Sequence, residues 1–146
     1  MPEKETLERA RKDKREGKAA STQAGEFVRE EIEHVREGKH GARSTKQAIA
    51  IGLSKARRAG VKLGPPKKAS KETREQAARD TRKGKSPGKG KKSAKRSRAT
   101  LAALKREGHS AASKIALSRQ AHKAAARRSV ASRSRSAKKA AATRKK

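Results

Sequence analysis

Large apolar side chains are too few and too unevenly placed for the whole chain to share one core. Leu, Ile, Val and Phe together number 15 of the 146 residues, and nine of these fall between Phe27 and Leu63. A highly charged chain with less than roughly 20% of such residues is expected to be largely disordered. We therefore expect packed structure near residues 27–63, in one small helical module with only a marginal core.

Two apolar stripes predict a helical hairpin over residues 21–63. The first helix would run from a cap at Ser21 or Thr22 to about Glu37, and the second from about Ser44 to Gly60. Gly52 would let the two helices approach closely. At three- and four-residue spacing, the stripes contain Ala24, Phe27, Val28, Ile32 and Val35, then Ala48, Ile49, Gly52, Leu53 and Ala56. The connection of about seven residues is longer than the three- or four-residue turn of a helix-turn-helix, so it favours a simple helical hairpin.

The remaining segments are predicted to be arms with little to bury. Residues 1–20 form a charged helical arm in which only Leu7 could be buried. Residues 64–99 form a basic flexible linker with a weak helix at 70–82, residues 100–128 a second weak helical pair, and residues 129–146 a disordered basic tail. The predicted fold class is therefore mostly α with extensive disorder: a small helical hairpin with basic, flexible arms.

Positive charge is concentrated in the second half of the chain. The formal net charge is +30, yet residues 1–40 are neutral, while residues 81–146 hold 23 Lys or Arg and a single acid, Glu107. We expect such a segment to bind a polyanion. Nucleic acid is the commonest cellular polyanion whose charges, the phosphates, lie in long regular rows.

The sequence offers no set of residues for catalysis, and we expect no enzyme, no metal and no cofactor. Cys is absent, which excludes disulfides, thiol nucleophiles and Cys-based zinc sites. We expect all four histidines to occupy exposed positions in helices or turns: His34, His40, His109 and His122. We expect the clustered acids to form solvated ion pairs: Glu26, Glu30, Glu31 and Glu33.

Duplex DNA is the polyanion that the composition favours. The chain has no Trp or Tyr and one Phe that should be buried, so it lacks the stacking surfaces of single-stranded RNA modules. Asn is absent as well, which removes one of the two amides that read adenine edges. We predict contacts to phosphates from the hairpin bases Lys46, Lys55, Arg57 and Arg58, from a first cluster of Lys89, Lys91, Lys92, Lys95, Arg96 and Arg98, and from a second of Arg127, Arg128, Arg133, Arg135, Lys138 and Lys139.

The segment Ser44–Gly60, with the sequence STKQAIAIGLSKARRAG, carries a resemblance that extends back through Glu26–Val28 and Arg36–Gly41. Over roughly residues 20–63 the chain resembles a family of short, basic bacterial proteins that are often labelled DNA-binding. Beyond Lys91, its Ala, Lys and Ser composition is similar to that of linker-histone tails and bacterial histone-like proteins. Together these resemblances imply a nucleoid-associated, histone-like protein.

Three alternatives to DNA binding stay open. Unstructured cationic arms also thread folded RNA, so an RNA- or ribosome-associated protein fits the charge. Hydrophilic Ala/Lys/Glu helices also occur in stress-protective disordered proteins. The hairpin could instead self-associate through the face containing Phe27, Ile32 and Leu53. The longest apolar run, Ala48–Ile51, is far too short for a membrane span, so we expect a soluble protein of the cytoplasm and nucleoid.

Overall fold

Every regular element in the part of the chain that the structure describes is a helix. The computed structural model describes residues 1–86 and 93–144. Within these residues the elements are α1 (Lys4–Arg15), α2 (Ala20–Arg36), α3 (Thr45–Arg58), α4 (Lys71–Lys85), α5 (Ala94–Lys105), the short 3-10 helix η1 (Ser110–Ala112), α6 (Lys114–Ala126) and α7 (Val130–Arg144). The α-helical prediction is confirmed, but the prediction of extensive disorder is wrong.

Local propensity explains why the expected arms are helical. Ala, Lys and Arg are strong helix formers even where little apolar surface is available for packing. Serines supply the starts: the side chains of Ser70, Ser93 and Ser113 each accept a hydrogen bond from a backbone N–H in the first turn of α4, α5 and α6. Residues 94–99, at the end of the predicted flexible linker, form the first turns of α5.

The predicted hairpin is formed by α2 and α3. A Cβ added at Gly52 would lie 2.7 Å from Val28 Cα, so the absence of a side chain there sets how closely the helices pack. Ser44 caps α3 by accepting from Gln47 N at 3.2 Å, as expected. The start of α2 differs from the prediction, because its N-cap is Ala19, which has no capping side chain.

Two small hydrophobic clusters form the core along this hairpin. One contains Ile32, Val35 and Ala48, together with Ala111 and Ala112 from the second half of the chain. The other contains Ala24, Phe27, Ala56, Val61 and, from α1, Ala10. The core therefore extends beyond the hairpin at both ends, which the scarcity of large apolar residues did not indicate. Alanines achieve this because their small side chains let helices approach.

Helix α4 is docked against α3 instead of lying in a flexible linker. Ala77 and Asp80 are buried between the two helices. Gly84, in the last turn of α4, lies so close to α3 that an added Cβ would be 2.1 Å from Arg57 O. The helix at this position was predicted, but its attachment was not.

The segment from Leu104 to Ala112 closes the opposite end of the hairpin. Gly41 N donates to Leu104 O at 2.9 Å, and Ala42 N donates to Gly108 O at 3.0 Å. Arg36 Nε donates to Ala112 O at 2.9 Å. These bonds join residues more than sixty positions apart, so the second half of the chain is part of the fold.

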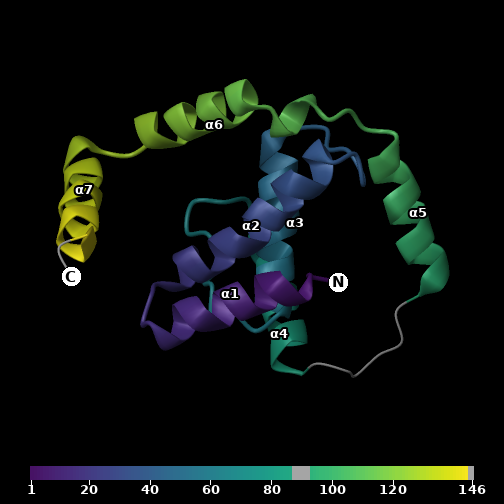
Figure 1. Ribbon diagram of the computed structural model, residues 1–146, viewed down its shortest axis with the longest axis horizontal. Helices are drawn as coiled ribbons and strands as arrows, with labels where there is room; N and C mark the ends of the chain where they lie inside the picture. Colours follow the sequence, from purple (N-terminus) through teal and green to yellow (C-terminus); the bar gives the residue numbers. More distant parts are fainter. Residues whose placement is uncertain (87–92, 145–146) are drawn as a thin grey trace.

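Figure 1 shows the resulting arrangement, in which α1 to α4 form a central bundle and α5, α6 and α7 follow one another around its outside. No residue of α5, α6 or α7 is buried. Within residues 1–86 and 93–144, no helix is long and apolar enough to cross a membrane.

Candidate nucleic-acid interface

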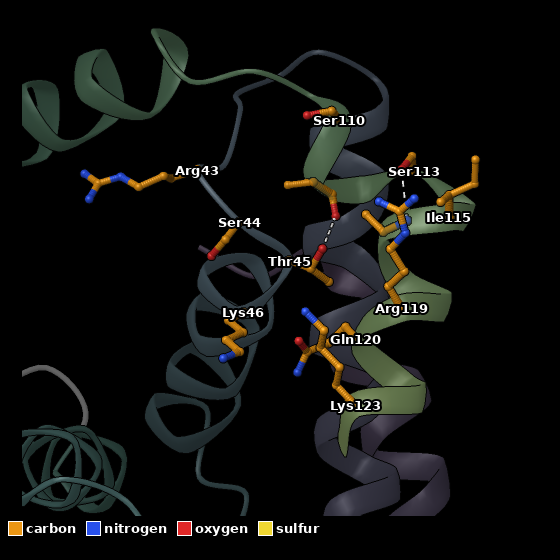
Figure 2. Close-up of a pocket in the computed structure, with 12 residues that line it drawn as sticks. Arg43, Ser44, Thr45, Lys46, Ser110, Ser113, Ile115, Arg119, Gln120 and Lys123 are labelled. Carbon is orange, nitrogen blue, oxygen red and sulfur yellow. Dashed lines mark hydrogen bonds between the residues drawn. The ribbon is translucent and has the colours of Figure 1, made fainter. Parts of the chain in front are cut away.

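A groove lies where the amino-terminal ends of α3 and α6 meet. Its volume is about 560 Å³, and it is lined by the segment from Arg43 to Lys46, by η1 and by the first three turns of α6. Figure 2 shows Lys46 on the α3 side, and Arg119, Gln120 and Lys123 along α6. The lining contains four bases and no acid.

Backbone and hydroxyl contacts hold the two sides of the groove together. Thr45 is buried, and its hydroxyl donates to Ala111 O at 2.6 Å, the bond drawn in the centre of Figure 2. Ser44 and Ser113 cap α3 and α6, so both helices present their amino-terminal ends at the groove. The partial positive charge of a helix amino terminus favours anions, and the neighbouring bases add to it.

The bases of the groove differ in whether they already lie near an acid of the protein. Arg43 points away from the other bases in Figure 2, and its guanidinium lies 3.6 Å from the Glu107 carboxylate with the side chain 81% exposed. Lys46, Arg119 and Lys123 are exposed, and among the described residues no acid lies within ion-pair distance of them. These three charges are therefore available to an external anion.

Of the four hairpin bases predicted to contact phosphate, the structure places only Lys46 at the groove. Lys55 Nζ lies 2.6 Å from Glu31 Oε2 and 3.2 Å from Glu30 Oε1. Both acids are buried, so the expectation that they form solvated ion pairs is wrong. Burial raises the pKa of Glu30, but hydrogen bonds from Thr6 and the Glu3 backbone, with the charge of Lys55, lower that pKa overall.

Arg57 and Arg58 also make contacts within the fold. Arg57 is buried and directs its guanidinium to Leu63 O and Gly64 O, each at 3.4 Å. Arg58 Nε donates to Asp80 Oδ1 at 2.7 Å, which ties α3 to α4. Contacts from these residues to phosphate stay a prediction, and each would compete with an existing internal interaction.

The first predicted cluster is only partly described. Lys89, Lys91 and Lys92 lie outside the described residues. Lys95, Arg96 and Arg98 are exposed on the first turns of α5. With about 100° between successive helix residues, Lys95 and Arg98 share one face, whereas Arg96 lies about 160° from Arg98, on a different side of the helix.

The second predicted cluster lies in the connection between α6 and α7 and in the first part of α7, and its members do not share one face. Arg135, Lys138 and Lys139 lie within an arc of roughly 100° around α7, whereas Arg133 lies on the opposite side. Two further bases, Arg127 and Arg128, occupy the connection between α6 and α7. Arg128 binds Ser132 and Ser136 in the first turns of α7, so it also helps to place that helix.

Sequence reasoning missed Arg43, Arg119 and Lys123 as members of one site. Arg43 and Arg119 are 76 positions apart, and periodicity within either segment carries no information on their proximity. A signal did exist: each segment has a Ser that can cap a helix, followed by bases with no nearby acid. The docking through Thr45 and Ala111, which brings the two segments together, has no such signal.

The structure also brings three potential metal ligands together, although the sequence predicted no metal site. Glu31, His34 and His40 each place one ligand atom within 4.8 Å of the others. His40 is buried, so its predicted exposed setting is wrong. This cluster lies at the carboxyl end of α2, and the groove residues are not part of it.

Comparisons with known proteins identify similarity in the first half of the chain. Residues 4–69 match the model of a family described as a family of unknown function (DUF6496). No curated protein and no solved structure matches the chain. The matched residues include α1, α2 and α3. The start of α3 lines one side of the groove, whereas α6 on the other side lies beyond the match.

Proposed function

We propose that the protein is a non-enzymatic, largely sequence-independent DNA-binding protein of the histone-like or nucleoid-associated kind, and that the groove between α3 and α6 holds phosphates of the DNA backbone. The observation that carries this proposal is the lining of the groove, in which bases from two distant segments gather without any acid. Backbone phosphates need only positive charge and N–H donors, so such a lining suits them regardless of base sequence.

The peripheral helices support the same function. The helical segments of α5, α6 and α7 contain no acidic residue, and most of their bases are exposed. These helices follow one another around the bundle in Figure 1, and we assign their exposed bases to further phosphate contacts beyond the groove. A duplex presents regularly spaced phosphates, and each phosphate neutralised releases condensed counterions.

The side chains needed to read bases are scarce on this surface. No Trp, Tyr or Asn occurs in the chain, and the one aromatic residue of the Phe, Trp and Tyr class, Phe27, is fully buried. Stacking of bases on Phe, Trp or Tyr is therefore not available, which favours duplex DNA over single-stranded RNA. Arg and Lys can still contact guanine edges, but the proposal assigns them to phosphates.

The test of the groove is a triple variant, Lys46→Gln, Arg119→Gln and Lys123→Gln, compared with wild type for binding to two unrelated DNA duplexes. Because of counterion release, the logarithm of the affinity falls with the logarithm of the salt concentration, with a slope of about 0.9 per phosphate contact. Losing three contacts should therefore make this slope shallower by about 2.7. The loss should be equal for both duplexes.

A second triple variant provides the matched control: Lys4→Gln, Arg11→Gln and Lys14→Gln. These bases are exposed on α1, away from the groove lining, and removing them lowers the net charge by the same three units. The control should keep the wild-type slope within about one unit. Equal losses in the two triples would show that only overall charge matters and would overturn the assignment of the groove.

A further inference from the structure

Glu31, His34 and His40 gather at the carboxyl end of α2. Glu31 and His34 are three residues apart, so both side chains leave the same face of the helix. Gly38, with φ of +73°, turns the chain after α2, and His40 returns to that face. The Glu31 side chain is 1% exposed, that of His40 9% and that of His34 13%, so the cluster is largely shielded from solvent.

The contact between His40 and Glu31 needs a cation. His40 Nδ1 lies 3.0 Å from Gly41 O, and because a carbonyl oxygen only accepts, Nδ1 carries a proton. In the neutral ring, Nε2 is then an acceptor, and it lies 3.1 Å from Glu31 Oε1. Two acceptors at this distance repel each other unless a proton or a metal ion joins them.

We propose that Glu31, His34 and His40 form a binding site for a zinc-like divalent metal ion. Zinc bonds of about 2.0–2.2 Å in a tetrahedral arrangement separate ligand atoms by about 3.3 Å. The Glu31–His40 pair already has nearly that separation, and the ligand atom of His34 lies within 4.8 Å of both. Imidazole and carboxylate ligands suit zinc, and three protein ligands leave the fourth position to water.

The neighbours of all three ligands act as an outer shell. Gly41 O fixes the tautomer of His40 with Nε2 toward Glu31. Glu3 Oε1 lies 2.9 Å from His34 Nε2, which leaves Nδ1 of His34 for the ion. Lys55 contacts the other carboxylate oxygen of Glu31, so Oε1 stays available. Carboxylates and carbonyls that hold metal-binding histidines in this way are a usual feature of metal sites.

The charge around the cluster also differs from that of the rest of the chain. Residues 1–40 have no net charge, whereas the whole protein carries +30. Three acids, Glu3, Glu30 and Glu31, lie close to the cluster, and two bases, Lys39 and Lys55, contact them. A divalent cation therefore meets less repulsion at this end of α2 than beside α5, α6 and α7, which contain no acid.

The test uses the full-length protein without a histidine tag, titrated with Zn²⁺ alone in competition with a chromophoric chelator. Wild type should bind one ion. His34→Ala should weaken binding by at least about 100-fold, because the loss of a ligand exceeds the 10–100-fold effect of an outer-shell loss. Glu3→Gln should fall within that 10–100-fold range. His122→Ala, at an exposed position of α6, is the control and should bind as wild type does.

Cobalt provides a second readout that does not depend on stability. Co²⁺ in wild type should give the intense visible d–d absorption of a tetrahedral ion, and His34→Ala should lose it while circular dichroism shows unchanged helicity. No uptake of Zn²⁺ by wild type, or equal affinity in wild type and His34→Ala, would overturn the proposal. The cation between His40 and Glu31 would then be a proton.

Discussion

Replacing Asp80 by Ala would remove the carboxylate that joins α4 to α3. Asp80 is fully buried and accepts hydrogen bonds from Ser54 Oγ at 2.5 Å and from Arg58 Nε at 2.7 Å. Gln76 Nε2, one turn earlier on α4, lies 3.3 Å from both carboxylate oxygens. The substitution therefore leaves the buried end of Ser54 without its acceptor and Arg58 without its counter-charge.

The cost can be worked out from these contacts. Removing one partner of a buried ion pair costs about 3–5 kcal/mol. Arg58 is half exposed and water can replace its partner, so the lower end applies and we expect a loss of about 3 kcal/mol. For a chain of this length that corresponds to a decrease in Tm of roughly 10 °C. Asp80→Asn should lose about half as much, because the amide oxygen still accepts from Ser54.

Urea unfolding followed by far-UV circular dichroism measures this loss; the chain has no Trp or Tyr for fluorescence. Glu75→Gln, at an exposed position on the same helix, is the control and should stay within about 0.5 kcal/mol of wild type. An Asp80→Ala variant equally close to wild type would refute the reasoning.

The pH dependence of the same variants gives an independent check. Burial raises the pKa of Asp80, but the hydrogen bonds from Ser54 and Arg58, with the Arg58 charge, lower that pKa overall. A lowered folded-state pKa means that the stabilisation is complete above the unfolded value of about 3.9 and is lost as the pH falls through the folded value. Wild type and Asp80→Asn should therefore differ at pH 7 and begin to converge only as the pH falls below about 3.9.

Three further substitutions test how the helices are packed. Gly52→Ala should lower the free energy of unfolding in urea by about 1–3 kcal/mol, because its Cβ would meet the Val28 backbone. Gly25→Ala, with open space around it, should raise the free energy of unfolding by up to about 1 kcal/mol. Changes of the same sign in the two variants would contradict the close approach of α2 and α3. Thr45→Val should weaken the docking of η1 by about 1–2 kcal/mol, since Ala111 O loses its donor, and hydrogen exchange should rise at η1 while staying unchanged at α1.

Helices α1 to α4 could be predicted from the sequence because their signals are local, whereas α7 lies in the segment that was predicted to be a disordered tail. Ser44, the glycines after the helices and the apolar stripes of α2 and α3 lie within a few residues of the structure they determine. The close approach at Gly52 was predicted for the same reason, since a glycine within an apolar stripe is a local feature.

The packing of the second half of the chain could not be predicted in this way. Ala111, Ala112 and Ala77 are buried, yet alanine gives a weak hydrophobic signal and is also common in exposed helices. The bases Lys55 and Arg58 look identical to free cations in the sequence, and only the fold shows that acids are buried beside them. Disorder was predicted from low apolar content, which underestimates helices that are stabilised by propensity and capping.

The most direct test of the proposed function is the binding of wild-type protein to two unrelated DNA duplexes and a structured RNA at several salt concentrations. We predict equal affinity for the two duplexes, weaker binding to the RNA, and affinity that falls steeply as salt rises. Preferential binding to the RNA, or negligible binding to either duplex near physiological salt, would contradict the proposal that this protein is a DNA-binding protein.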